Sequence, residues 1–276
     1  MKKEKVEIAK HKIKSYGWKP QFPDHRDLVF QPLSSVLSKL PSSVDLRSQC
    51  PSVYDQGQLG SCTANAIGSA VEFELRKQAL IDDFIPSRLF IYYNERVIEG
   101  TVNSDSGAMI RDGIKTVNKQ GVCAEALWSY SDNTTQFKKK PTAKCVKEAL
   151  NHKVITYQSV TQDLSHIQAS LASGYPVIIG FSVYDGFESD SVAKTGVVNL
   201  PAKTESLLGG HAVLIVGYDN TTQRFIVRNG WGSSWGQKGY FTIPYTYFTN
   251  VLRDPPDTRL ACVNSRGKNK LKEVVL

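Results

Sequence analysis

One of the five cysteines stands where a glycine-bearing turn runs into a helical pattern. The stretch runs from Gln56 to Ala66 and contains Cys62. A helix N-terminus carries partial positive charge and unpaired amide donors, so it favours the nucleophilic thiolate. Gly57 and Gly60 would let the backbone approach a bound molecule, and the Gln56 amide could donate a hydrogen bond to an oxyanion. For this cysteine alone, a small buried residue at a helix start is the simpler interpretation.

A histidine and an asparagine in the second half of the chain favour a catalytic role for Cys62 over a purely structural one. His211 follows two glycines and precedes an apolar run, while Asn229 ends the run Phe225–Arg228. Two adjacent strands would bring them together. A nucleophile, a base and a group that orients the base are what covalent acyl transfer needs. The other histidines lie in polar surroundings typical of surface positions: His11, His25, His152 and His166.

These stretches resemble the papain-like cysteine peptidases, from about Leu40 to about Cys262. Leu40–Arg47 is similar to the start of a mature enzyme of that family, and 230–241 is similar to its tryptophan-rich turn. The resemblance implies an α+β, papain-like two-lobed fold. A mainly helical lobe and an antiparallel β-barrel-like lobe would enclose the active cleft.

The resemblance also implies a role for each residue of the site. Cys62 attacks a peptide carbonyl, Gln56 and the Cys62 amide hold the oxyanion, His211 protonates the leaving amine, and Asn229 orients His211. Trp231 shields the histidine and asparagine from water. The implied activity is that of a cysteine endopeptidase working through an acyl-enzyme, without a metal or cofactor. Peptide or protein substrates are the implied partners.

The stretch 106–109 resembles the wall of the family's substrate groove, where backbone groups pair with an extended peptide. Met109 would line the main specificity pocket and favour an apolar side chain two positions before the cleaved bond. A buried methionine at a helix start is the alternative. The substrate-binding residues implied are Ser106, Gly107, Met109, Gly210, Ala212 and Trp231.

Two residues depart from the family pattern. Leu59 stands where many members have a disulfide cysteine, and Thr63 stands where they usually have a tryptophan. The first removes the usual bridge, and the second changes the packing beside the nucleophile. We therefore expect Cys50, Cys123, Cys145 and Cys262 to be reduced thiols, which favours an intracellular setting.

Residues 1–39 carry nine Lys/Arg and four Asp/Glu, with aromatic residues at Tyr16, Trp18, Phe22 and Phe30. A disordered leader is one interpretation of this charge. The aromatic residues favour another, in which the segment is a short propeptide that lies along the cleft and makes the protein a self-inhibited zymogen. It is shorter than the long helical prodomain of many family members.

The resemblance implies a papain-like peptidase domain over 40–265, and the residues that follow, 266–276, form a basic tail. We expect a helical lobe at about 60–150 and a β lobe at about 151–250, with the chain ends crossing over. The predicted helices are 62–79, 87–98, 108–120 ending at Gly121, and 163–172 with Thr161 as a possible cap. The predicted strands are Lys153–Val160, Pro176–Val183, Ala212–Asp219, Phe225–Arg228 and Gly239–Ile243.

The 276 residues carry a formal charge of +8, which belongs to the two ends of the chain. Basic ends without a nucleic-acid-binding motif give no reason to expect specific nucleic-acid binding. No apolar run approaches the roughly 20 residues of a membrane span, and the start lacks the apolar core of a signal peptide. We expect a monomer in the cytoplasm or another intracellular setting.

Two other functions fit the same residues. A ligase or transpeptidase would pass the acyl group to an amine, and product masses would separate it from a peptidase. A peptide-binding module without turnover would keep the groove, but the complete set of four catalytic residues argues against it.

Overall fold

The computed structural model describes residues 13, 16–22, 24–78, 84–133, 135–154 and 156–249, and the backbone of 260–262. Its helices are α1 (Ser34–Leu37), α2 (Cys62–Lys77), α3 (Arg88–Ile98), α4 (Ile110–Gln120), α5 (Ala143–Ala149), α6 (Leu164–Ala172), α7 (Asp190–Thr195) and α8 (Tyr245–Thr249). Its strands are β1 (Ser43–Asp45), β2 (Gln158–Val160), β3 (Val177–Tyr184), β4 (Leu207–Asp219), β5 (Arg224–Arg228), β6 (Tyr240–Pro244) and β7 (Leu260–Cys262).

The strands form one antiparallel sheet in the order β2-β7-β3-β4-β5-β6. β1 pairs with the far end of β4, where Asp45 lies opposite Gly217. β3 and β4 are mostly apolar where Val177–Phe181 pairs with His211–Ile215, and the residues of that stretch are buried. The predicted α+β fold, with a helical part and an antiparallel β part, is confirmed.

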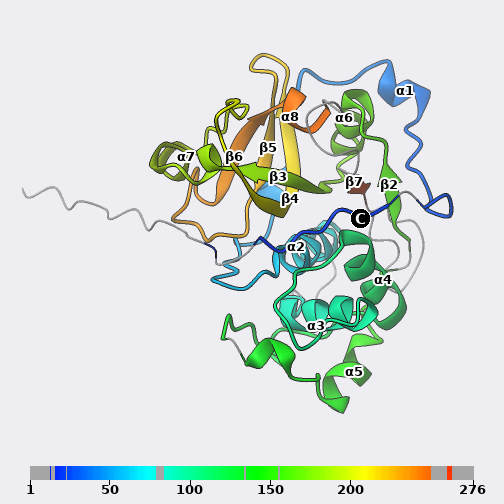
Figure 1. The fold of residues 1–276 in the computed structure, drawn as a ribbon. Coiled ribbons are helices and arrows are strands. Elements are labelled where there is room, and N and C mark those ends of the chain that lie inside the picture. Colours follow the sequence, from blue (N-terminus) through cyan, green and yellow to red (C-terminus); the bar gives the residue numbers. More distant parts are fainter. Residues whose placement is uncertain are drawn as a thin grey trace, which may run out of the picture.

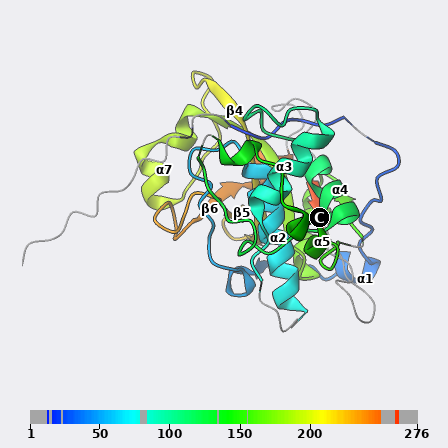
Figure 2. The same ribbon diagram turned by 90° about the horizontal axis from the view of Figure 1, so that it is seen from below.

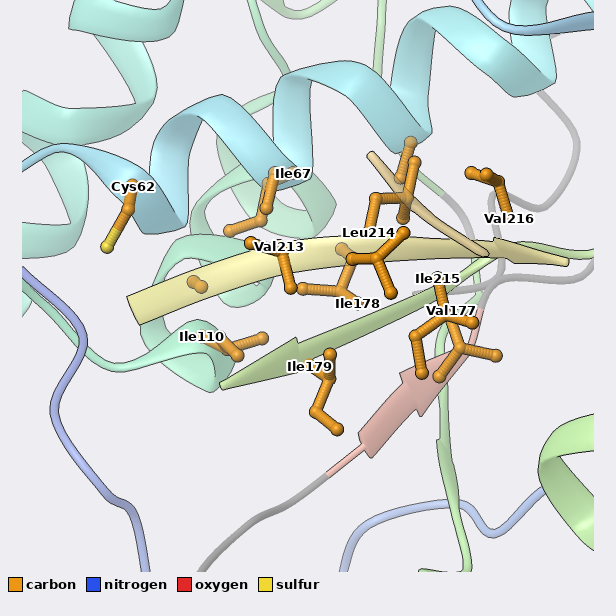
Figure 3. Close-up of a cluster of buried hydrophobic side chains, with 14 of the residues drawn as sticks. Cys62, Ile67, Ile110, Val177, Ile178, Ile179, Val213, Leu214, Ile215 and Val216 are labelled. Carbon is orange, nitrogen blue, oxygen red and sulfur yellow. The ribbon is translucent and has the colours of Figure 1, made fainter. Parts of the chain in front are cut away.

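α2 is the central element of the molecule. Figure 1 shows the sheet on one side of α2 and α3, α4 and α5 on the other, and Figure 2 shows α3 and α4 beside it from a second direction. Its apolar residues recur at helical spacing, so one face meets β3 and β4. In Figure 3, Ile67 points from α2 toward these strands and Cys62 lies at the start of the helix. Packing on both sides fixes the direction of that start.

The predicted helices at 62–79, 87–98 and 108–120 match α2, α3 and α4, and Gly121 ends α4 with φ 78°. The suggested cap Thr161 is wrong. Asp163 caps α6, and its side chain accepts from the backbone N–H groups of Ser165 and His166. Helix α5 was not predicted, although Thr142 accepts a hydrogen bond from Cys145 N–H in the usual manner of an N-cap.

The strand expected over Lys153–Val160 is confined to Gln158–Val160. Over the described residues it pairs with β7, where Gln158 lies opposite Cys262 and Val160 opposite Leu260. The other four predicted strands agree with β3 to β6 within a few residues, except that β4 begins five residues earlier, at Leu207.

The N-terminal chain lies against the folded domain over its described part. The dark blue segment in Figure 1 follows the junction between the sheet and the helices. Further along, Phe30 N–H donates to the Ser159 carbonyl and Ser159 N–H donates to the Leu28 carbonyl. Trp18 and Phe30 are buried, whereas Phe22 is 83% exposed. The lysine-rich opening over 1–12 and the basic tail over 266–276 lie outside the described residues.

Two further observations concern the described residues. Cys50, Cys62, Cys123 and Cys145 have free thiols, and the side chain of Cys262 lies outside the described part. No helix among the described residues is long and apolar enough to cross a membrane.

Arg228 ties β5 to the chain that leads into the nucleophile turn. Its buried guanidinium donates to the carbonyls of Pro51 at 2.8 Å and Ser52 at 2.6 Å, and to the Ser69 hydroxyl at 3.3 Å. The bond to the Pro51 carbonyl is buried and the bond to the Ser52 carbonyl is partly buried, so water reaches the first carbonyl poorly.

We predict that Arg228→Met lowers the free energy of unfolding by about 3 kcal/mol, because it removes these bonds and leaves the buried Pro51 carbonyl unpaired. Arg47→Met is the matched control, since its pair with Asp45 is exposed and contributes less than about 1 kcal/mol. Urea unfolding measures both. Equal changes in the two variants would contradict the role given to Arg228.

Candidate active site

A short antiparallel backbone pairing joins the chain before the cysteine to the chain after the asparagine. Gln56 N–H donates to the Gly230 carbonyl and Gly232 N–H donates to the Tyr54 carbonyl, each at 2.9 Å. We call this the inter-lobe pairing. It connects the turn leading into α2 with the turn leaving β5, so groups far apart in sequence share one site.

Cys62 is the first residue of α2, as the sequence predicted, and is 1% exposed. Hydrogen bonds of the preceding residue hold this helix start in place. The Ser61 hydroxyl lies 2.6 Å from the Tyr130 hydroxyl, and the Asn65 amide donates to the Ser61 carbonyl at 2.9 Å. Tyr130 also donates to the Gln56 carbonyl at 2.8 Å. Tyr130 therefore couples the nucleophile's helix to the inter-lobe pairing.

His211 and Asn229 meet as the sequence predicted. His211 Nε2 lies 2.8 Å from Asn229 Oδ1, which also accepts from Gly230 N–H at 2.8 Å. β4 supplies the histidine and the turn after β5 supplies the asparagine, so the pairing of these strands sets their separation. The Trp231 ring covers His211 with ring centres 5.1 Å apart. Both rings are buried, which keeps water from the histidine–asparagine bond.

The Gln56 side chain is buried near the start of α2. Its Nε2 donates to the Leu59 carbonyl at 3.0 Å. A primary amide carries two N–H donors, so this bond leaves one for an oxyanion. Gly57 has a different role from the one the sequence suggested. Its φ of 56° and the 2.2 Å from its ideal Cβ to Asp132 Oδ2 show that the turn itself requires glycine.

The two departures from the family pattern have structural explanations. Leu59 is buried and apolar, so its side chain packs in the core at the position where the family pattern has a disulfide cysteine. The Thr63 hydroxyl donates to Glu95 Oε1 of α3 at 2.7 Å. Burial raises the pKa of Glu95 well above its usual value, and the hydrogen bond from Thr63 acts in the opposite direction. The hydroxyl of Thr63 is thus satisfied by a carboxyl from the neighbouring helix.

Residues 16–22, which we call the N-terminal strap, run through the groove over Cys62. Ala108 N–H donates to the Gly17 carbonyl at 2.7 Å, and Lys19 N–H donates to the Ala108 carbonyl at 3.0 Å. On the opposite wall, Trp18 N–H donates to the Gly210 carbonyl at 2.9 Å. The strap therefore makes backbone bonds with both lobes.

Gly17 is the point at which the strap passes the thiol. An ideal Cβ on this residue would lie 1.8 Å from the Gly60 carbonyl oxygen, and one on Gly107 would lie 2.0 Å from the Gly17 carbonyl oxygen. Three stretches of backbone thus pack together without side chains between them. The expectation that Gly60 permits close backbone approach agrees with this arrangement.

Side chains on either side of Gly17 fix the strap. The Tyr16 hydroxyl donates to Glu188 at 2.7 Å, and its ring meets His211 edge-on with centres 6.0 Å apart. Lys19 forms an ion pair with the mostly buried Glu99 at 2.8 Å. The strap thus covers the nucleophile and the histidine together.

The predicted groove wall, residues 106–109, lies beside the strap, but its residues make different contacts from those expected. Ala108 supplies the backbone pairing, whereas Gly107 N–H donates to the Tyr92 hydroxyl at 3.2 Å and Ser106 bonds Thr101. Met109 is half-buried, and its N–H donates to Glu99 at 2.7 Å at the start of α4. The preference for an apolar substrate side chain that we based on Met109 stays a prediction.

Burial beneath the strap raises the pKa of the Cys62 thiol to about 12. Backbone hydrogen bonds from Ala212 and Gly17 act in the opposite direction but are outweighed. The covered cysteine is therefore protonated at neutral pH. Uncovering it would return water to the site and restore the thiolate that the helix start and the histidine favour.

Taken together, these groups can perform acyl transfer. The site contains a thiol, an oriented imidazole and an amide donor, in a groove that pairs with an extended backbone. His211 contacts Asn229, and Gln56 lies in the turn that leads to Cys62. The sequence did not identify Gly17, Tyr130 or Glu95 as parts of the site. Of these three, only Gly17 could have been suspected from the sequence, because it lies between Tyr16 and Trp18 in an aromatic stretch.

Residues 40–250 match the family described as papain family cysteine protease. The chain is 42% identical over 258 residues to the uncharacterized peptidase C1-like protein L477 of Acanthamoeba polyphaga mimivirus, covering 85% of this chain and 82% of that one. It is 45% identical to xylellain, a cysteine protease from Xylella fastidiosa, with a TM-score of 0.85, covering 92% and 98% of the two chains. Procathepsin B of Trypanosoma congolense, at 18% identity and a TM-score of 0.73 over 92% and 87%, shares the fold.

The covered thiol predicts slow alkylation of Cys62 by iodoacetamide at pH 7 in the full chain. Because burial raises its pKa, the rate should climb as pH rises toward about 12. In Gly17→Val the strap cannot pass Gly60, so the rate should be high at neutral pH and level off at a lower pH. Peptide mapping by mass spectrometry measures the rate. The same pH profile in both proteins would show that the strap does not control the thiol.

Proposed function

Because the chain belongs to the papain family of cysteine proteases, we propose that Cys62, His211, Asn229 and Gln56 form its catalytic set and that residues 1–39 keep it self-inhibited. As a cysteine-type peptidase, it acts on peptide substrates. The observation that carries the proposal is the Gly17 backbone lying over a buried thiol, next to the 2.8 Å contact between His211 and Asn229.

In the proposed reaction, the Cys62 thiolate attacks the carbonyl carbon of a peptide bond. The carbonyl oxygen becomes an oxyanion that accepts hydrogen bonds from the Gln56 amide and the Cys62 backbone N–H. Protonated His211 gives its proton to the leaving amine as the C–N bond breaks, leaving a thioester. Water then attacks the thioester and gives a proton to His211. The carboxylic acid product leaves, and the thiolate and protonated histidine are restored.

Asn229 acts on the histidine rather than on the substrate. With Nε2 carrying a proton that it donates to Asn229 Oδ1, the other ring nitrogen is available for proton transfer. Contact with the tilted Trp231 ring limits rotation of the imidazole and excludes water from this bond. The contribution of Asn229 is therefore orientation, which other contacts of the buried ring partly share.

The contacts of the strap support self-inhibition. Gly17 and Lys19 occupy the backbone partners at Ala108 that an extended substrate would need, and Trp18 occupies the one at Gly210. Because the strap is tethered, its effective concentration is high, roughly millimolar for a short linker. A substrate must therefore displace it before the thiol can react.

Hydrolysis of a fluorogenic peptide library tests the proposal. The full-length chain should be less active than Gly17→Val and than a chain beginning at Leu40, because both changes clear the groove. A separate peptide with the sequence of residues 1–39 should inhibit the shortened chain far more weakly than the tethered segment does. Cys62→Ala within Gly17→Val should abolish hydrolysis. Equal activity of the full-length and Gly17→Val proteins would refute self-inhibition, and turnover without Cys62 would refute the catalytic set.

We predict that Gln56→Ala in the Gly17→Val background lowers kcat by about 10²–10³, the loss expected for one oxyanion donor. Gln58→Ala is the matched control, because Gln58 is exposed two residues away and should leave kcat within about twofold. Steady-state kinetics on one fluorogenic peptide compares them. An unchanged kcat for Gln56→Ala would mean that its amide only supports the turn.

For the histidine and its partner, His211→Ala should reduce kcat more than Asn229→Ala does, since the histidine transfers the proton and the asparagine orients it. Both variants are made in the Gly17→Val background and compared at one pH, with circular dichroism as the check on folding. The opposite ranking in folded proteins would require different roles for the two residues.

A further inference from the structure

A buried arginine of the helical part contacts the turn that leads into Cys62. Arg88 is the first residue of α3, and the Ser87 hydroxyl caps this helix by accepting from Phe90 N–H at 3.2 Å. Only 8% of Arg88 is exposed. Because α3 is capped at this end and packs against α2, the direction from which the arginine side chain approaches the turn is fixed.

One nitrogen of this arginine bonds the chain on both sides of the turn. Its Nη1 donates to the Asp55 carbonyl and to Asn65 Oδ1, each at 3.2 Å. Asp55 directly precedes Gln56 in the chain. Asn65 donates to the Ser61 carbonyl at 2.9 Å, immediately before Cys62. The guanidinium therefore links the segment before the glutamine to the start of the cysteine's helix.

A carboxylate and two aromatic rings hold the guanidinium in place. Nη2 and Nε donate to the two carboxylate oxygens of Glu125 at 2.6 and 3.0 Å. The centre of the Tyr130 ring lies 3.9 Å from the guanidinium carbon, and the centre of the Tyr54 ring lies 4.4 Å from it. The bidentate pair and the ring contacts fix the plane of the guanidinium and its rotation within that plane. Nη1 is thereby directed at the turn.

Both tyrosines also take part in the bonding of the site. The Tyr130 hydroxyl donates to the Gln56 carbonyl at 2.8 Å and lies 2.6 Å from the Ser61 hydroxyl. The Tyr54 carbonyl accepts from Gly232 N–H in the inter-lobe pairing. Apart from the carboxylate, every group that we have placed against the guanidinium belongs to the segment 54–65 or bonds directly to it.

We propose that Arg88 is a positioning residue that sets the separation of the two oxyanion donors, the side-chain amide of Gln56 and the backbone N–H of Cys62. The inference rests on the proposed function, because these donors act only if the chain performs acyl transfer. The two donors must converge on one oxygen, and a misplacement of about 1 Å can lower the rate by about 10²-fold. A lysine at this position would not replace the arginine, because one ammonium cannot bond the carboxylate, the carbonyl and the asparagine in the same plane.

The test compares hydrolysis with alkylation in the full chain carrying Gly17→Val. Arg88→Lys should lower kcat for a fluorogenic peptide by about 10–10²-fold and leave KM within about twofold, since the lost interaction acts in the transition state. Alkylation of Cys62 by iodoacetamide should stay within about twofold of the parent rate, because displacement of iodide at a saturated carbon forms no oxyanion. A general loosening of the site would change both rates.

A double-variant cycle identifies the group through which Arg88 acts. If it positions the Gln56 amide, Arg88→Lys should cost less than about threefold in kcat once Gln56→Ala is present. Additive losses would overturn the proposal, and so would an unchanged kcat in Arg88→Lys or an equal fall in hydrolysis and alkylation. Absence of hydrolysis in the Gly17→Val parent would count against the proposed function instead.

Arg224→Lys is the matched control. Arg224 of β5 is another partly buried arginine, and it donates to the hydroxyl and the carbonyl of Thr242 in β6 at 3.0 and 2.9 Å. Its replacement should leave kcat within about twofold, because these partners do not bond the segment 54–65.

A second variant decides the question if circular dichroism shows that Arg88→Lys does not fold. Glu125→Gln keeps the size of the side chain and replaces one of the two acceptors with an N–H donor, which releases one arm of the guanidinium. It should lower kcat without changing the alkylation rate, and by a smaller factor once Gln56→Ala is present. An unchanged kcat in Glu125→Gln would overturn the role given to Arg88.

Discussion

The candidate site depends on the inter-lobe pairing between the turn before Cys62 and the turn after Asn229. Its two backbone bonds, from Gln56 to Gly230 and from Gly232 to Tyr54, join the helical part to the sheet next to the reacting groups. α2 is fixed by packing against β3 and β4, and His211 is fixed within β4. The pairing then sets where the amide of Gln56 lies relative to both. Acyl transfer needs positions accurate to a fraction of an ångström, and backbone pairing supplies this more reliably than flexible side chains do.

Much of this arrangement could be predicted from the sequence. The apolar spacing after Cys62 defined α2, and β-branched runs before Gly217 and Asn229 defined two strands of the sheet. Cys62, His211 and Asn229 were identifiable because each stands at the beginning or end of a patterned run in the sequence, with glycines nearby. One strand was predicted too long. It covers Gln158–Val160 and not Lys153–Val160, and its pairing with Leu260–Cys262 joins segments far apart in the chain, which no local pattern reveals.

The contacts that complete the site are long-range, and the sequence did not contain a readable signal for them. Gly17 touches Gly60 and Gly107, residues that are dozens of positions away, and its importance comes from the lack of a side chain. Thr63 replaces a tryptophan and is satisfied by Glu95 from another helix, a compensation visible only after α2 and α3 are packed. The same holds for Gly180, whose missing side chain creates space for Trp18. The sequence shows that a residue is a glycine, but only the folded structure shows which segment packs where its side chain would be.

The most direct test of the central claim is to trap the acyl group on the enzyme. The Gly17→Val chain is mixed with an activated ester of a short peptide, quenched in acid at successive times and digested for mass spectrometry. The account predicts an acyl adduct on the peptide that contains Cys62, formed rapidly and lost as product appears, and absent when Cys62 is replaced by alanine. Product formation with no adduct, or an adduct on Cys50, Cys123 or Cys145 that decays at the rate of turnover, would contradict it.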